Sequence, residues 1–134
     1  MSIGFIGVGL MGGPLARNLI RAGKEVMVFD LSEEAVQKTL DAGTTGAAAG
    51  SLDDLAGCDL VFTSLPMPPH VEGVMLGDDG LLAKMKKGAV HVELSTIDPQ
   101  TSVKLRDAAS DKGIGFMQCT LGKTPAHAEK AEEP

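Results

Sequence analysis

A glycine-rich run close to the N-terminus is the feature that most restricts how this chain can fold. Residues 7–12 read Gly-Val-Gly-Leu-Met-Gly, follow the short apolar segment Ile3–Ile6, and precede apolar residues at helical spacing. A strand that turns sharply into a helix needs glycine at the turn and where the helix approaches the strand. The run therefore predicts a strand–turn–helix unit at the start of a parallel sheet.

The rest of the chain alternates short apolar runs with longer stretches that suit helices. The expected strands cover residues 26–29, 60–64, 89–94 and 115–118, and the expected helices 33–42, 71–76, 81–85 and 99–112, with one short capped turn after Ser51. Such alternation is typical of βαβ units, whose right-handed crossovers place helices on both faces of a sheet. We predict an α/β fold: a Rossmann-type, doubly wound, mostly parallel sheet with helices on both faces.

Composition narrows the classes of partner. The chain has 134 residues, which suits one domain, and a net charge of −6 without any basic run, so we expect no nucleic acid partner. No apolar stretch reaches membrane-spanning length and no basic leader precedes the first strand, so we expect no membrane partner and a cytoplasmic location. Cys58 and Cys119 are expected to be reduced, and the three histidines lack metal-ligand spacing.

The glycine-rich run also predicts a dinucleotide site. Gly7 permits the tight turn, Gly9 lets a pyrophosphate approach the backbone, and Gly12 lets the helix pack on the strand. The N–H groups around Leu10 and Met11 would face the phosphates at the helix N-terminus.

Asp30 ends the second expected strand, 18 residues after Gly12. A carboxylate at that place accepts hydrogen bonds from ribose hydroxyls and repels a 2′-phosphate. No Arg follows, since the next residues are Leu31 and Ser32, so the sequence favours NAD over NADP. In the alternative interpretation, Asp30 only caps the turn before the second helix.

Three segments carry a family resemblance. Residues 5–19 resemble the signature of the 3-hydroxyisobutyrate dehydrogenase (β-hydroxyacid dehydrogenase) family. The most specific part is residues 11–19, which read Met-Gly-Gly-Pro-Leu-Ala-Arg-Asn-Leu. Residues 64–66 are similar to its Leu-Pro loop beside the adenosine and ribose, and residues 93–99 to its Asp-x-Ser-Thr-Ile-x-Pro segment beside the nicotinamide. The resemblance implies hydride transfer between NAD(H) and a short β-hydroxyacid or its semialdehyde.

The resemblance also implies roles for particular residues. It places Leu65, Pro66 and Thr96 at the cofactor, with His70 as a further cofactor contact. It places Ser95 and Thr96 at the substrate. His91, which alternates with valines, is expected to be structural.

The last segment departs from the family pattern. Where the family has Ser-Gly-Gly against the substrate carboxylate, this chain has Gly122, Lys123 and Thr124. This version is similar to the sulfolactaldehyde reductase branch, and we expect Lys123 to bind the acidic head group of a small anionic substrate. The alternative is a solvated lysine on an acidic tail, residues 123–134, that follows a dinucleotide-binding domain of residues 1–122.

The family's catalytic lysine lies in a C-terminal helical domain that follows the cofactor domain. The chain ends at Pro134, and Lys112 and Lys123 lack the matching context, so we expect no catalytic residue here, no activity from this chain alone, and oligomers only from a full-length chain. Two alternatives stay open. One is a non-enzymatic nucleotide-binding module, and the other is the cofactor domain of a 6-phosphogluconate dehydrogenase. The family of 6-phosphogluconate dehydrogenases uses NADP and has a sequence similar to Asn-Arg-Thr at this place. Residues 30–32 of this chain read Asp-Leu-Ser, which argues against the second alternative.

Overall fold

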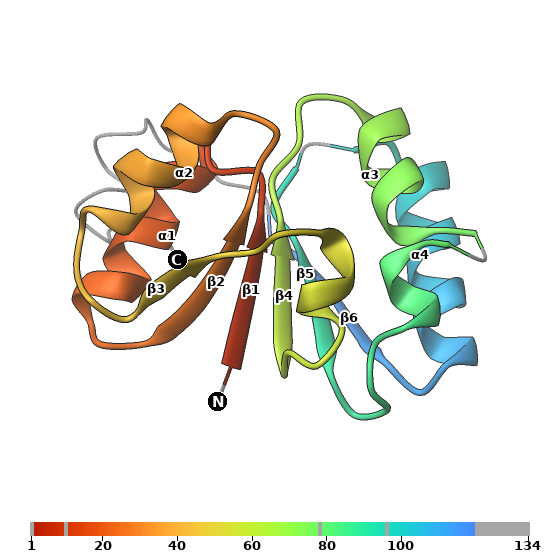
Figure 1. Ribbon diagram of the computed structural model, residues 1–134. Coiled ribbons are helices and arrows are strands. Elements are labelled where there is room, and N and C mark those ends of the chain that lie inside the picture. The colour runs from red at the N-terminus through yellow and green to blue at the C-terminus, as the bar shows by residue number, and fades with distance from the viewer. Residues whose placement is uncertain (1, 10, 78, 96, 120–134) are drawn as a thin grey trace.

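A single parallel sheet forms the centre of the molecule. The computed structural model describes residues 2–9, 11–77, 79–95 and 97–119. The sheet has the order β3-β2-β1-β4-β5-β6, and every neighbouring pair runs parallel (Figure 1). The strands are β1 (Ser2–Ile6), β2 (Glu25–Phe29), β3 (Gly46–Ala48), β4 (Leu60–Thr63), β5 (Val90–Glu93) and β6 (Gly115–Gln118). This order confirms the predicted Rossmann-type fold.

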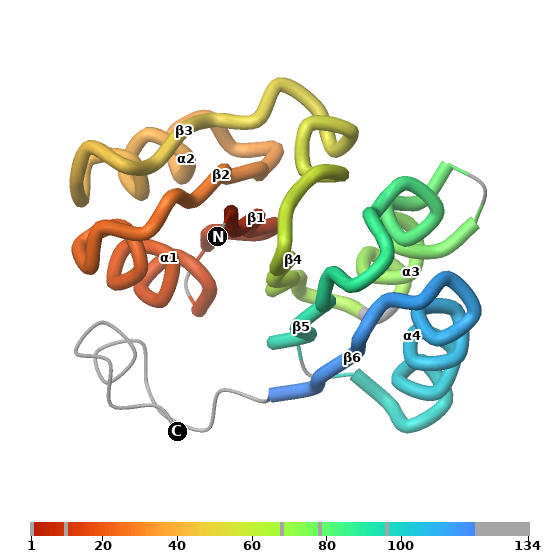
Figure 2. The backbone as a smooth tube through the Cα atoms, turned by 90° about the horizontal axis from the view of Figure 1, so that it is seen from below, coloured from red at the N-terminus to blue at the C-terminus, as the bar shows by residue number. Residues whose placement is uncertain are grey.

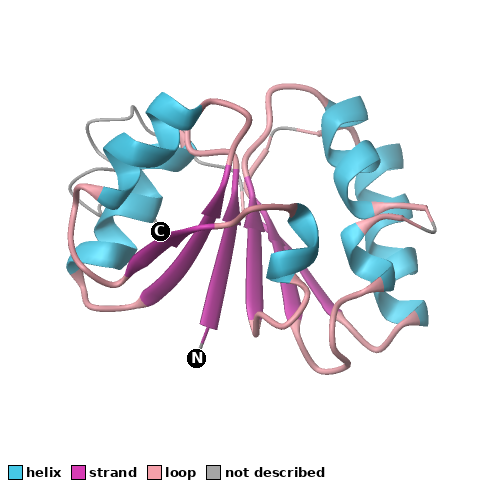
Figure 3. Ribbon diagram, in the orientation of Figure 1, coloured by secondary structure: helices cyan, strands magenta, loops and turns pink. Residues whose placement is uncertain are grey.

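Helices cover both faces of the sheet, as predicted. They are α1 (Gly12–Arg21), α2 (Glu33–Leu40), α3 (Pro68–Met75) and α4 (Pro99–Asp111), with short 3₁₀ turns at Leu52–Leu55 and Leu81–Ala83. Helices α1 and α2 lie together at one side, and α3 and α4 at the other (Figure 3). Figure 2, turned by 90°, shows α1 and the α3–α4 pair on opposite sides of the twisted sheet.

Local signals in the sequence account for most helix ends. The side chain of Ser32 accepts a hydrogen bond from the Ala35 N–H at 3.2 Å and begins α2. Asp98 does the same for α4, where its carboxylate accepts from the Thr101 N–H at 3.1 Å and Pro99 takes the first helical position. Gly23, at φ +84°, follows the end of α1 in the left-handed conformation that glycine adopts without strain.

One strand was not expected, and several element boundaries differ from the prediction by one to three residues. The edge strand β3 was not expected, because its Gly-Ala-Ala sequence has little strand propensity and it forms by pairing with β2. Helix α3 begins at Pro68, three residues earlier than expected, since prolines are tolerated in a first turn. Helix α2 ends at Leu40 rather than at residue 42.

The core consists of two layers, one on each face of the sheet. Strand residues alternate between them: Phe5 packs toward α1, and its ring stacks on that of Phe62 with centroids 5.3 Å apart. Ile6 and Val61 pack on the other face, against α3 and α4. The two cysteines form no disulfide, and no helix in the described residues is long and apolar enough to cross a membrane.

Candidate functional site

A cleft of about 800 Å³ opens at the carboxyl ends of the central strands. The chain leaves β1 toward α1 on one face and leaves β4 toward α3 on the other, so the two loops separate there. This is the switch point at which open α/β sheets bind ligands. The lining residues are Ile6, Gly7, Gly9, Met11, Gly12, Phe29, Asp30, Leu31, Leu52, Ser64, Leu65, Pro66, Pro69, His70, Gly73 and Val74.

In the loop between β1 and α1, the packing of the fold itself requires glycine at two positions. Gly7 has φ +90°, and a Cβ added there would lie 2.1 Å from the carbonyl oxygen of Ser64. A Cβ on Gly12 would lie 2.2 Å from the carbonyl oxygen of Gly7. Glycine at both positions lets the loop pass β4 closely and lets α1 pack on β1.

Gly9 is different, because no packing within the described residues explains it. It is exposed, lines the cleft, and a Cβ built on it would meet no atom within 4 Å. A side chain at this position would therefore occupy open space in the cleft. Glycine here keeps the backbone accessible to a ligand that approaches closely.

The N-terminus of α1 meets the same cleft. The side chain of Met11, the N-cap residue, accepts no capping hydrogen bond, and the first turn of α1 has no acidic residue. By contrast, α2 begins with the Ser32 cap followed by Glu33 and Glu34. The partial positive charge of the α1 terminus is thus not neutralised by its own first turn, which suits a phosphate group.

Asp30 closes the other side of the glycine-rich loop. Its Oδ2 accepts a hydrogen bond from the Val8 N–H at 2.9 Å, and its Oδ1 accepts one from the Ser32 N–H at 2.8 Å. Asp30 therefore caps the turn before α2, as the alternative interpretation has it. Each carboxylate oxygen has a second lone pair, so both oxygens can still accept from ribose hydroxyls in the cleft.

The loop between β4 and α3 forms the opposite wall. Leu65 lies partly buried in it, and its N–H donates a hydrogen bond to Oγ of Ser95 at 2.7 Å. Pro66 and His70 are exposed at the rim. Ser95 itself lies behind this wall, only 5% exposed, and is not among the lining residues.

The structure brings together most of the residues predicted at the cofactor. Eight of them line the one cleft: Gly7, Gly9, Met11, Gly12, Asp30, Leu65, Pro66 and His70. Five other predicted cofactor or substrate residues lie outside the described residues: Leu10, Thr96, Gly122, Lys123 and Thr124.

Sequence reasoning missed several lining residues. Leu31 is 93% exposed at the mouth of the cleft, and a large apolar residue directly after Asp30 was the available signal. Leu52, Gly73 and Val74 reach the cleft from the turn after β3 and from α3. No local pattern distinguishes these three from ordinary core residues, because the fold alone brings them to the site.

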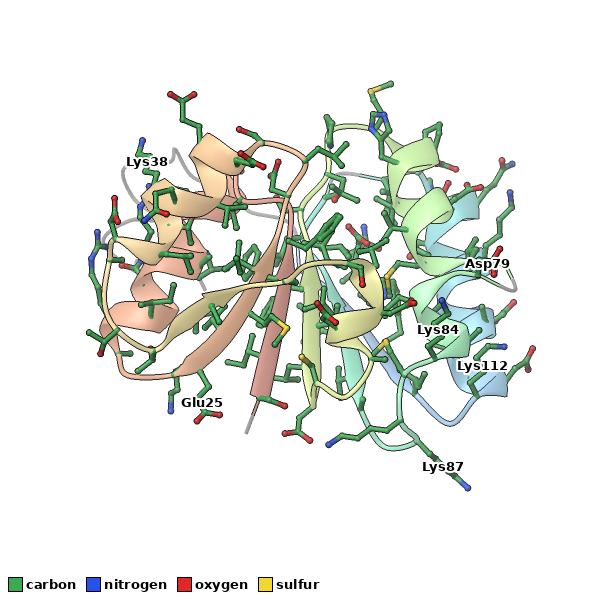
Figure 4. The ribbon with its side chains drawn as sticks, in the orientation of Figure 1. Glu25, Lys38, Asp79, Lys84, Lys87 and Lys112 are labelled. Carbon is green, nitrogen blue, oxygen red and sulfur yellow. The ribbon has the colours of Figure 1, made fainter. Side chains whose placement is uncertain are left out.

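No lysine lines the cleft within the described part of the chain. Lys112 follows the end of α4, and both Lys112 and Lys84 lie well below the carboxyl ends of the strands in the view of Figure 4. Lys84 pairs with Asp53 at 2.6 Å, and this hydrogen bond raises the pKa of Lys84. Neither lysine is placed to protonate a ligand in the cleft.

Comparison with known proteins agrees with this geometry. Residues 2–132 match the family described as the NAD binding domain of 6-phosphogluconate dehydrogenase. The chain is 44% identical to 3-hydroxyisobutyrate dehydrogenase of Pseudomonas aeruginosa, over 89% of this chain and 40% of that protein. It is 35% identical to 3-sulfolactaldehyde reductase of Escherichia coli, over 95% of this chain and 42% of that protein.

Solved structures show the same fold. The 3-hydroxyisobutyrate dehydrogenase of Mycobacterium tuberculosis, solved with L-serine, superposes with a TM-score of 0.86 at 27% identity, covering 97% of this chain and 43% of that one. Psf3 in complex with NADP⁺ and 2-OPP gives a TM-score of 0.88 at 28% identity, over 96% of this chain and 45% of that one. The chain thus spans less than half the length of the relatives it matches.

Proposed function

Because this chain belongs to the family of the NAD binding domain of 6-phosphogluconate dehydrogenase, we propose that its cleft holds NAD(H) for a dehydrogenase of short β-hydroxyacids or their semialdehydes. The observation that carries the proposal is Gly9, whose missing side chain leaves open space beside the N-terminus of α1. A nicotinamide cofactor bound there would accept or donate the hydride of such a reaction.

Each side of the cleft has a role in this proposal. The N–H groups around Leu10 and Met11 bind the pyrophosphate, which the glycine loop admits to the backbone. Asp30 accepts hydrogen bonds from the adenosine ribose on one side. Leu65, Pro66 and His70 border the nucleoside on the other, and Thr96 the nicotinamide.

Asp30 also determines which dinucleotide binds better. A 2′-phosphate would lie against its carboxylate, and two negative charges at that distance cost several kcal/mol. Psf3, a structural relative, is solved with NADP⁺, so the fold itself does not exclude NADP. We propose that this chain prefers NAD because it carries a carboxylate at this position and Leu31 after it.

The substrate proposal rests on relatives and sequence. The relatives are named for 3-hydroxyisobutyrate, L-serine and 3-sulfolactaldehyde, which are small and polar. We propose that Ser95, Thr96, Gly122, Lys123 and Thr124 form the substrate end, with Lys123 binding an acidic head group. A general acid would come from a lysine outside this chain, so the chain alone would be inactive. In a protein that includes such a domain, Lys123→Ala should raise the substrate KM strongly, and an unchanged KM contradicts this role.

Titration with NADH, and separately with NADPH, tests the cofactor proposal directly. The chain has no Trp or Tyr, so nicotinamide fluorescence can be followed with little protein background. Tighter binding of NADH than of NADPH supports both the site and the role of Asp30. Tighter binding of NADPH contradicts the role of Asp30, and binding of neither contradicts a dinucleotide site in this chain.

A further inference from the structure

Three polar side chains lie fully buried behind the wall of the cleft. Thr63, His91 and Glu93 each have 0% exposure and project from β4 and β5 on the α3–α4 side of the sheet. The ring of Phe116 packs edge-on against His91, with centroids 5.4 Å apart. A carboxylate is costly to bury unless hydrogen bonds satisfy it, so its partners indicate what it does.

The hydrogen bonds within this trio have a definite direction. The Thr63 hydroxyl lies 2.5 Å from Oε1 of Glu93 and 2.8 Å from Nε2 of His91. A hydroxyl carries one proton, which Thr63 donates to the carboxylate, so His91 donates its Nε2–H to Thr63. Nδ1 of His91 has no hydrogen-bond partner among the described residues, which fits an unprotonated nitrogen in an apolar setting.

The second oxygen of Glu93 connects the trio to the cleft. Its Oε2 accepts a hydrogen bond from the Ser95 N–H at 3.0 Å, which fixes the chain just after β5. Oγ of Ser95 accepts the Leu65 N–H at 2.7 Å, in the loop after β4. One buried carboxylate thus holds the ends of two neighbouring strands, β4 and β5. The loop after β4 forms the wall of the cleft.

We propose that Glu93 is a positioning residue for the dinucleotide cleft, acting through Ser95 on the backbone of Leu65. Glu93 is fully buried and does not line the cleft, and its function is to hold the loop after β4 where a dinucleotide meets it. What Glu93 supplies is an acceptor aimed at the Ser95 N–H. The predicted effect of Glu93 on NADH binding rests on the proposed function. The predicted effect of Glu93 on the position of the loop does not.

Two substitutions of Glu93 separate positioning from general stability. Glu93→Met fills a similar volume but removes both acceptors. Glu93→Gln can turn its carbonyl toward the Ser95 N–H while its amide donates to Thr63, whose hydroxyl then donates to Nε2 of His91. The His91 ring then carries its proton on Nδ1, which has no acceptor among the described residues, so this variant should lose stability while it keeps the hydrogen bond to Ser95. We expect Glu93→Met to weaken NADH binding about tenfold, the effect of losing one hydrogen bond to a charged group, and Glu93→Gln to restore most of it.

Two further variants complete the test. Ser95→Ala removes the acceptor of the Leu65 N–H, and the double variant with Glu93→Met should bind NADH no worse than Glu93→Met alone, because both act on one chain of contacts. Thr39→Val is the matched control. Thr39 is also fully buried, and its hydroxyl donates to the Ala35 carbonyl at 2.9 Å in α2, away from this loop, so this variant should lower the melting temperature without changing NADH affinity.

The exchange rate of the Leu65 amide proton, measured by NMR without ligand, reads the loop directly. Glu93→Met and Ser95→Ala should accelerate it, and Glu93→Gln should not. If Glu93→Met only lowers the melting temperature, like Thr39→Val, the proposal is wrong. If wild type fails to bind NADH while the exchange pattern holds, the proposed function fails and the loop-positioning role stands. Should Glu93→Met not fold, unchanged Leu65 exchange in Ser95→Ala overturns the proposal.

Discussion

The backbone N–H of Val8 donates a hydrogen bond of 2.9 Å to Oδ2 of Asp30, which ties the glycine-rich loop to the end of β2. The other oxygen of the same carboxylate accepts from the Ser32 N–H at 2.8 Å. The residue that we expect to select the cofactor therefore also shapes the loop that we propose binds it. Substitution of Asp30 must then affect both stability and binding.

Asp30→Asn separates these two effects only in part. Its amide leaves one of the two backbone N–H groups facing a donor, which should cost about 1–2 kcal/mol of unfolding free energy. Removal of the charge should weaken NADH binding and strengthen NADPH binding, so that the preference between them narrows about tenfold or more. Denaturation and parallel fluorescence titrations check both. Asp41→Asn, an exposed carboxylate that accepts from Gln37 at the end of α2, is the control. An unchanged preference in Asp30→Asn would argue against charge repulsion as the basis of selectivity.

Gly9 and Gly7 should respond in opposite ways to a side chain. Gly9→Val places its side chain in open space, so the unfolding free energy should change by no more than about 0.5 kcal/mol while NADH binding is lost. Gly7→Ala forces alanine to φ +90° and its Cβ against the Ser64 carbonyl, which should cost at least about 2–3 kcal/mol. Thermal unfolding and NADH titration of both variants make the comparison. Full NADH affinity in a stable Gly9→Val would sink the assignment of Gly9 to the ligand.

The sequence predicted the fold well because its signals are local. Glycine at the first turn, Ser32 and Asp98 at helix starts, and continuous apolar strands each follow from the chain's nearest neighbours. The edge strand Gly46–Ala48 escaped prediction because it has no such signal. A Cβ on Gly46 would lie 2.8 Å from the Ile20 side chain, so its sequence is set by close packing against α1.

The site was predictable where a motif reports it and not where distant residues meet. The motif identified Gly9 and Asp30, and the structure brings both to the cleft. The bond from Val8 to Asp30 joins residues 22 apart, and the Thr63–Glu93 contact joins residues 30 apart. Sequence alone gives an alternating β5 in which Glu93 could face either solvent or core, and only pairing with β4 determines its partners.

Acid should lower the free energy of unfolding through Asp59, which directly precedes the central strand β4. Hydrogen bonds from the Lys86 ammonium and then from the Ser2 N–H lower the pKa of Asp59 from 3.8 to about 2. A depressed pKa in the folded state stabilises the fold above the unfolded value, and this stabilisation is lost as pH falls from about 4 to about 2. Asp59→Asn should therefore show a shallower loss of stability across this window, measured by urea unfolding at several pH values. The exposed Asp111→Asn is the control, and identical pH slopes in all three proteins would contradict this role.

The two cysteines should differ in reactivity toward iodoacetamide. Cys58 is only 4% exposed. Burial raises the pKa of its thiol, and this effect is larger than the opposing effect of the hydrogen bond with Ser2, which lowers the pKa. Because the thiolate is the nucleophile, a buried thiol with a raised pKa reacts slowly near neutral pH. Cys119 follows β6 and is partly exposed.

We expect mass spectrometry of the native protein at pH 8 to show alkylation at Cys119 first. Cys58 should be modified only when the protein opens, so low urea should accelerate its modification more than that of Cys119. Cys58→Ser keeps the shape but buries a hydroxyl, and should leave the modification rate at Cys119 unchanged. Equal native rates at both thiols would contradict the protection of Cys58 that is expected from its burial in the core cluster with Leu55 and Val61.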